Sequence, residues 1–263
     1  MKIPLRNRKQ RELPPPQEPE DNELRMGFFD HLDELRGRTF KILIAVVLGT
    51  ILGSIIAGDV LQYLIEPYAN IYPDETQRLV VLGPTGAVVT YFKVALMVGG
   101  ILSIPVITYQ ILLFIVPGLT SKERRYLLSA LPAITLLFLI GVAFAWFILI
   151  PPAITFLEGF QSDIFKPEWT AENYISFVTA LLFWMGVSFE TPLVFFLMSL
   201  FGIVTAGLLV KNWRFAVVGT AIAAALITPT IDPVNMFLVM GPLLALYGFS
   251  IILVMIGSRI TRA

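Results

Sequence analysis

The stretch His31–Arg38 places charged and polar side chains together immediately before an apolar segment. On a helix, Glu34, Leu35 and Arg38 would share one face, because residues three and four apart are neighbours. In one interpretation this is an interfacial helix whose charges face water, with Glu34 and Arg38 forming a weak pair. In the other it is a recognition surface whose exposed carboxylate, Glu34, accepts hydrogen bonds from a ligand. The stretch by itself leaves both interpretations open.

A second carboxylate, Glu123, lies in a basic loop with Lys122, Arg124 and Arg125. The loop also fits a helix start near Ser121 followed by basic residues that anchor the chain at a membrane surface. Anchoring at the membrane surface would explain the basic residues but not Glu123, which would lie on the same side of the membrane as Glu34.

Glu190 is the only carboxylate deep inside an apolar run. It lies about 24 Å from the outer end of that run, at 1.5 Å per helical residue. An ionisable group at this depth costs at least ~2.5 kcal/mol, so it should face protein or water rather than lipid. Glu190 is then either a protonated side chain bonded to a neighbouring helix or a polar site for a substrate, a proton or a partner helix.

The other groups that carry enzymatic chemistry are scarce. The chain has no cysteine and one histidine, which excludes disulfides, thiolate metal sites and sites with several histidines. No phosphate-binding loop or dinucleotide-binding turn occurs. We therefore expect no enzyme, no metal and no cofactor.

The elements that position these residues are apolar. Of 263 residues, 56% are hydrophobic and 14% are charged, and the mean hydropathy is +0.79. This composition predicts an all-α integral membrane protein that crosses the bilayer several times. The fifth run has only about fifteen residues, so we expect a short helix. The sixth contains Gly241-Pro242, so we expect it to be short or kinked. The six predicted spans are 40–57, 92–116, 127–150, 174–201, 213–227 and 234–256.

The segments around the spans are also predictable. Residues 1–25 are rich in proline and charge and are expected to form a disordered tail. A short amphipathic helix is expected over 24–39. Residues 26–257 would form one membrane domain, and 258–263 would form a C-terminal tail. Gly49 and Gly53 permit a close helix contact, either within the bundle or with another chain. Prolines are expected to break four spans, at Pro105, Pro132, Pro192 and Pro242.

The lysines and arginines set the orientation. Sixteen of the 19 lie in the N-terminal region, the 117–126 loop, the 202–214 loop and the C-terminal tail. The opposite side holds only Arg78, Lys93 and Lys166. Basic loops stay in the cytoplasm, so both termini are predicted to be cytoplasmic.

Five stretches together resemble the TatC family, the multispanning core of the twin-arginine protein translocase. The resemblance covers about 28–256. The stretches that carry it are Phe29–Arg38, Pro105–Gln110 with Phe114, Pro117–Arg125, Gly186–Pro192 and Thr228–Pro233.

The resemblance implies a cupped, glove-shaped arrangement of six helices and a receptor surface on the cytoplasmic side. By position, Glu34 and Glu123 match the two carboxylates that contact the signal peptide, and Glu190 matches a buried polar residue on the concave face. Two adjacent arginines call for two carboxylates, because each guanidinium pairs bidentately with one. The same motifs assign Leu35, Arg36, Arg124 and Arg125 to the signal-binding patch, and Leu226, Pro229 and Asp232 to partner docking or structure.

The partners implied by the resemblance are twin-arginine signal peptides of folded cargo, TatA and possibly TatB, further copies of the chain, and the lipid bilayer. Nucleic acid is not among them. The function implied is export of folded proteins driven by the proton-motive force, in a prokaryotic plasma membrane or a thylakoid. The alternative is a proton-coupled transporter of a small solute with Glu190 as proton carrier. It explains the buried carboxylate but not Glu34 and Glu123.

Overall fold

A computed structural model describes residues 28–71, 79–115, 121–164, 168–228 and 232–260. These residues form α-helices and one π-helical turn, and the described part contains no strand beyond an isolated bridge between Val80 and Thr170. The elements are α1 (Phe28–Ile71), α2 (Gly86–Ile115), α3 (Ser121–Phe144), the π-turn η2 (Ala145–Leu149), α4 (Ile150–Gly159), α5 (Ala171–Leu200), α6 (Ala206–Lys211), α7 (Trp213–Ile227) and α8 (Pro233–Ile260).

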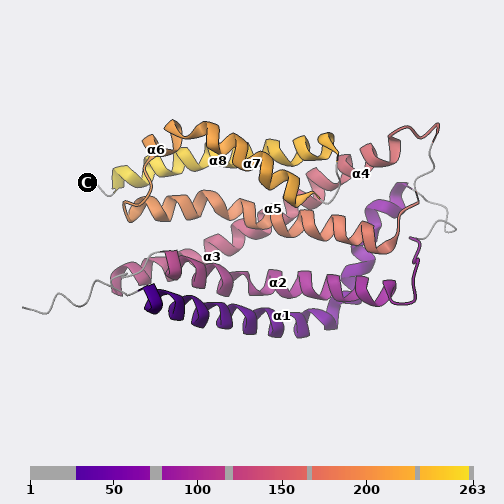
Figure 1. The fold of residues 1–263 in the computed structure, drawn as a ribbon, viewed down its shortest axis with the longest axis horizontal. Helices are drawn as coiled ribbons and strands as arrows, with labels where there is room; N and C mark the ends of the chain where they lie inside the picture. The colour runs from indigo at the N-terminus through magenta and orange to yellow at the C-terminus, as the bar shows by residue number, and fades with distance from the viewer. Residues whose placement is uncertain (1–27, 72–78, 116–120, 165–167, 229–231, 261–263) are drawn as a thin grey trace, which may run out of the picture.

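Five helical segments of the described residues are long and apolar enough to cross a membrane, and α7 is a shorter apolar helix. One of the five, Leu128–Gly159, runs through α3, η2 and α4. Figure 1 shows α1 and α2 side by side, α5 in the middle, and α6, α7 and α8 along the opposite side, while α3 crosses the bundle obliquely and leads into α4. The end that holds the first turns of α1 and the last turns of α8 is here named the terminal end. The opposite end, which holds the first turns of α2 and α5, is named the loop end.

The main core lies toward the loop end, where the last part of α1 turns across the bundle (Figure 1). Tyr174 is fully buried there, and its hydroxyl donates a hydrogen bond of 2.8 Å to the backbone oxygen of Leu64. Its ring packs edge-on against Tyr68 and Trp169. This aromatic cluster fixes the end of α1 to the start of α5 because a buried tyrosine needs a partner for its hydroxyl.

The small residues of α1 pack against α2 within the chain. A Cβ on Gly49 would lie 2.5 Å from the backbone oxygen of Gly99, and one on Gly53 would lie 2.7 Å from that of Ala95. Such distances exclude any side chain, so the glycines allow the two backbones to approach closely. Of the two uses that the sequence left open, contact within the bundle is the one observed.

Several elements differ from the sequence prediction. The predicted amphipathic helix and first span are one continuous helix, α1, of 44 residues. Pro105, Pro132, Pro192 and Pro242 lie inside continuous helices, so the predicted breaks are wrong. Each proline removes one backbone hydrogen bond, which a helix packed against neighbours can lose without ending.

The two last spans also differ from each other. α7 has 15 residues and is short, as predicted. α8 has 28 residues, so the prediction of a short sixth helix is wrong. Helix α6, between α5 and α7, was not predicted, because six residues give too little periodicity. The predicted tail at 1–25 lies outside the described residues.

Candidate functional site

The carboxylate of Glu34 is held by Arg38 one turn later on α1. Nε of Arg38 donates to Oε1 of Glu34 at 2.9 Å, and Nη2 donates to the same oxygen. Both side chains are 18% exposed. Glu34 is therefore partly buried rather than exposed, because the guanidinium lies over it. The predicted pair between positions four apart is present.

Arg38 also reaches the neighbouring helix. Its Nη1 donates to Oε1 of Gln110 on α2 at 3.5 Å, and Gln110 is buried. The site is thus built from two helices, and Gln110 had no role in the sequence prediction. The available signal was a polar amide inside an otherwise apolar run.

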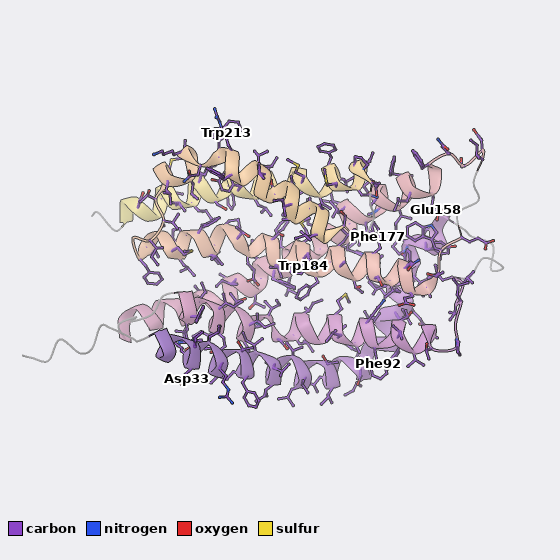
Figure 2. The ribbon with its side chains drawn as sticks, in the orientation of Figure 1. Asp33, Phe92, Glu158, Phe177, Trp184 and Trp213 are labelled. Atoms are coloured by element: carbon purple, nitrogen blue, oxygen red, sulfur yellow. The ribbon has the colours of Figure 1, made fainter. Side chains whose placement is uncertain are left out.

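Leu35 and Arg36 lie beside this pair and face outward. Leu35 is 41% exposed, and Arg36 is also exposed. Figure 2 shows Asp33 on the outer side of α1, away from the other helices. The pair formed by Glu34 and Arg38 therefore has an apolar and a cationic side chain next to it at the surface.

The second predicted carboxylate, Glu123, belongs to the first turn of α3, which begins at Ser121 as the loop composition predicted. The side chains of Glu123, Arg124 and Arg125 lie outside the described residues. Figure 1 shows the start of α3 at the terminal end, the same end as the start of α1. The backbone thus begins the two helices that carry these carboxylates at one end of the bundle.

Glu190 lies in α5 and is 7% exposed. The hydroxyl of Thr108, on α2, donates to its Oε2 at 2.8 Å. Oε1 is buried and has no hydrogen-bond partner among the described residues. A buried oxygen without a partner carries a desolvation penalty that an incoming donor would relieve. Thr108 is a further site residue that the sequence analysis did not assign.

An apolar groove of about 420 Å³ runs between α2 and α5. Its lining includes Leu96, Gly100, Phe183 and Trp184, and Figure 2 shows Trp184 directed from α5 toward α2. The groove is therefore better suited to burying the apolar side chains of a ligand than to forming hydrogen bonds with it.

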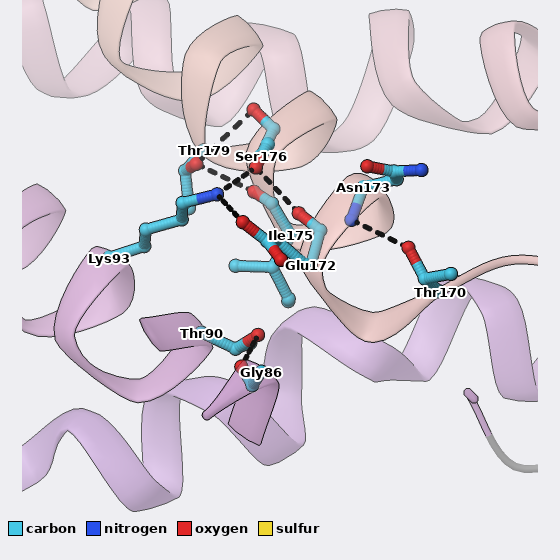
Figure 3. Close-up of polar contacts among 9 residues, drawn as sticks. All are labelled: Gly86, Thr90, Lys93, Thr170, Glu172, Asn173, Ile175, Ser176 and Thr179. Atoms are coloured by element: carbon cyan, nitrogen blue, oxygen red, sulfur yellow. Dashed lines mark hydrogen bonds and ion pairs between the residues drawn. The ribbon is translucent and has the colours of Figure 1, made fainter. Parts of the chain in front are cut away.

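A polar contact marks the loop end of this groove. Nζ of Lys93 donates to Oγ of Ser176 at 2.7 Å and to Oε1 of Glu172 at 3.1 Å (Figure 3). Lys93 and Glu172 are 36% and 50% exposed, so their ion pair adds little stability. The contact nevertheless joins α2 to α5 across the groove.

The residues assigned to partner docking have different environments. Leu226 is 79% exposed and continues an apolar stripe on α7, whose other members are Phe215, Val218 and Ile222.

Asp232 accepts a 2.7 Å hydrogen bond from the backbone nitrogen of Asn235 and a 3.0 Å bond from the Nδ2 of the same residue. This is an N-cap for α8, with Pro233 at the first helical position. Pro229 lies outside the described residues.

The described residues include no group of three or more His, Asp or Glu side chains that could hold a metal ion. What they do offer is a carboxylate that holds a guanidinium, a buried carboxyl with one unused oxygen, and an apolar groove. These features suit recognition of a cationic and apolar segment through ion pairs and burial.

Comparison with known proteins finds one family that this chain resembles over most of its length. A sequence model of the family "Sec-independent protein translocase protein (TatC)" matches residues 30–242. The Sec-independent protein translocase protein TatC of Carboxydothermus hydrogenoformans is 36% identical over 86% of this chain and 91% of its own length. The TatC protein of Synechocystis sp. is 34% identical over 86% of this chain and 87% of its own length.

A chloroplastic relative from Pisum sativum is 36% identical over 87% of this chain, which spans 63% of the pea protein's length. Among solved structures, a crystal structure of the twin-arginine translocase receptor TatC superposes with a TM-score of 0.76 at 35% identity. That match covers 87% of this chain and 100% of the crystallised chain.

Proposed function

Because the chain belongs to the TatC family of Sec-independent protein translocase proteins, we propose that it is the signal-peptide receptor and assembly core of a twin-arginine translocase. Its family makes it a translocase component and a multi-pass membrane protein. The finer proposal concerns which residues receive the signal and how.

The observation that carries the proposal is the contact between Arg38 and Glu34. It indicates that this place in the fold accommodates a guanidinium against a carboxylate. A signal arginine would make the same contact, either by replacing Arg38 or by sharing the carboxylate with it. Arginine is preferred over lysine because its planar fork donates several hydrogen bonds in fixed geometry.

Glu123 would receive the second arginine of the signal. It follows the start of α3 at the terminal end, where α1 also begins. Arg124 and Arg125 would keep that carboxylate ionised, while Leu35 and Arg36 would contact the residues around the arginine pair. This assignment rests on the family motif and on the placement of the two helices.

The apolar part of the signal would lie in the groove between α2 and α5. The groove begins on the same helix that carries Gln110 and continues past Phe183 and Trp184. Glu190 would offer its unpartnered Oε1 to a polar side chain of an entering helix. The apolar stripe of α7 that ends at Leu226 would receive a single-span partner such as TatA or TatB.

The proposed orientation places the terminal end in the cytoplasm, as the lysine and arginine distribution indicates. Transport of folded cargo would then proceed toward the loop end, with the proton-motive force as energy source and with several copies of the chain in the active complex. The membrane would be a prokaryotic plasma membrane or a thylakoid, since the relatives come from bacteria and chloroplasts.

The test is site-specific photocrosslinking in membranes that contain the full chain. A photoreactive residue at Leu35, which is exposed beside Glu34, should crosslink a twin-arginine signal peptide but not its twin-lysine counterpart. The same probe at Ile55, which is 76% exposed but far along α1, is the matched control. Equal crosslinking of both peptides at Leu35 would refute the receptor proposal.

The transporter alternative makes a different prediction. If Glu190 carries protons for a solute, proteoliposomes should take up that solute along a proton gradient, and Glu190→Gln should abolish uptake. The receptor proposal instead predicts that Glu190→Gln leaves crosslinking at Leu35 unchanged while it weakens later steps of export.

A further inference from the structure

A second cavity lies between the last turns of α1 and the π-turn, and it shares no lining residue with the groove. Its volume is about 410 Å³, and its lining combines aromatic, carboxylate and amide side chains. The residues that matter here are Tyr63, Glu66, Asn70, Trp146 and Phe147. None of them has a role in the proposed receptor function.

The aromatic wall of this cavity is built by the π-turn. Ala145–Leu149 adds one residue to the helical turn, an irregularity that often occurs at functional sites. The turn carries Trp146 to a stacked contact with Tyr63, with ring centroids 4.8 Å apart and planes at 26°. Tyr63 remains 51% exposed, so part of the stacked surface faces the cavity and its surroundings.

The electrostatics of the cavity favour a cation. Glu66 is exposed and forms no ion pair within the part of the chain that the structure describes. The cavity also lies beside the C-terminal end of α1, the negative pole of a helix dipole. That helix has no basic residue in its last turn. Aromatic faces next to a carboxylate are the usual environment for an alkylammonium group.

The position of the cavity points to the membrane as the source of that group. The apolar part of α1, residues 40–57, is about 27 Å long, close to the thickness of the hydrocarbon layer. The helix then turns across the bundle at the loop end (Figure 1), which puts Glu66 near the level of the lipid headgroups there. Phe147 and Ile148, next to the cavity, are 69% and 59% exposed and offer an apolar surface for acyl chains. Tyrosine and tryptophan are also enriched at this level.

We infer that this cavity binds the ammonium headgroup of a zwitterionic phospholipid in the leaflet at the loop end. Glu66 pairs with the ammonium, and the faces of Tyr63 and Trp146 contact its methylene or methyl groups. The acyl chains lie over Phe147 and Ile148. This site is separate from the signal site at the opposite end of the bundle, so its test does not depend on the receptor proposal.

The experiment is native mass spectrometry of the full chain, purified with an equimolar mixture of phosphatidylethanolamine and phosphatidylglycerol. The two lipids share the glycerophosphate and differ in the ammonium. We expect preferential retention of phosphatidylethanolamine, reduced about tenfold in Glu66→Gln by loss of a charge-assisted contact. Asp163→Asn removes an exposed carboxylate at the same end, outside the cavity, and should leave the preference unchanged.

Two further arms distinguish the outcomes. Tyr63→Leu should lower retention of phosphatidylethanolamine while Tyr63→Phe retains it, because the ring rather than the hydroxyl makes the contact. Soluble ethanolamine at the same concentration should not displace the lipid. Equal retention of phosphatidylglycerol, an unchanged preference in Glu66→Gln, or displacement by soluble ethanolamine would each overturn the inference. A preference for a lysine-containing peptide over the lipid would likewise reject a lipid as the occupant.

Discussion

Arg38 directs Nε and Nη2 at one oxygen of Glu34, Oε1, while its Nη1 reaches Gln110 on α2. One guanidinium thus joins the carboxylate expected to receive the signal to the helix that carries the groove. The contact between Arg38 and Glu34 is of the same kind as the contact proposed for an arginine of the signal peptide. Substitutions at Arg38 and Glu34 therefore test the proposal.

Arg38→Gln should increase the affinity of the chain for a twin-arginine peptide. The substitution removes a competitor for Glu34, and a pair of this kind is worth a few tenths of a kcal/mol, so the gain should be about twofold. Lys41→Gln removes an exposed positive charge from the same helix and should change the affinity less. Fluorescence anisotropy of a labelled peptide measures both. A large loss of affinity in Arg38→Gln would mean that Arg38 orients Glu34 for the signal instead of competing with it.

Glu34→Gln and Glu123→Gln should each weaken peptide binding at least about tenfold, since each removes one charge-assisted contact. A double-mutant cycle against single arginine-to-lysine changes in the peptide would assign each carboxylate to one arginine. Coupling confined to one carboxylate would remove the other from the signal-binding site. Asp33→Asn, on the outer side of α1, is the control for a change in local charge.

Thr108→Val should destabilise the chain by about 1–3 kcal/mol, because it leaves a buried carboxyl without its hydroxyl donor. Thr108→Ser keeps the donor and should lie closer to the parent chain. Thermal unfolding in detergent, followed by helical circular dichroism, measures the difference. Identical midpoints for Thr108→Val and the parent chain would show that the 2.8 Å contact with Glu190 contributes nothing to stability.

Gly99→Ala should destabilise the packing of α1 on α2 by about 1–3 kcal/mol, the usual range for an overpacked contact. The added Cβ would lie 2.4 Å from the backbone nitrogen of Thr50, and backbone atoms cannot move aside as a flexible side chain can. Gly219→Ala is the matched control, since a Cβ added there would have no neighbouring atom within 4 Å. That control should be neutral or stabilise α7 by up to about 1 kcal/mol. The order of the two unfolding midpoints decides the prediction.

Asp232→Ala should cost about 0.5–2 kcal/mol by removing the N-cap of α8. Asp232→Asn retains an acceptor oxygen and should recover most of the loss. Hydrogen exchange at the first turn of α8 measures the effect locally. If both variants instead leave exchange unchanged but impair export, Asp232 acts in partner docking and not in capping.

The helices were predictable where composition alone decides them. α7 begins and ends at the residues of the fifth apolar run, because Asn212 and Thr228-Pro229 bound a run with no internal interruption. The continuity of α1 was not predictable, since the amphipathic stretch and the first span differ in composition but share one unbroken backbone helix. Likewise, Pro242 indicates a weakened helix but not whether neighbouring helices support it.

The site was predictable in its residue types and in the pair of Glu34 and Arg38 within α1, but not in its contacts between helices. The depth of Glu190 follows from counting along a run, whereas its pairing with Thr108 depends on how α2 and α5 are rotated about their axes. The same holds for Gln110 and Arg38. Rotation is set by the whole packed interface, including the close approach of Gly49 to Gly99, and no single motif encodes it.

Thr108 and Gln110 lie two residues apart on α2 and therefore point about 200° apart around its axis. One contacts Glu190 on α5, and the other contacts Arg38 on α1. α2 therefore carries both contacts on nearly opposite sides of one helix, so a rotation of α2 about its own axis would change both at once. The close glycine contact between α1 and α2 that holds this rotation thus also determines where Thr108 and Gln110 point.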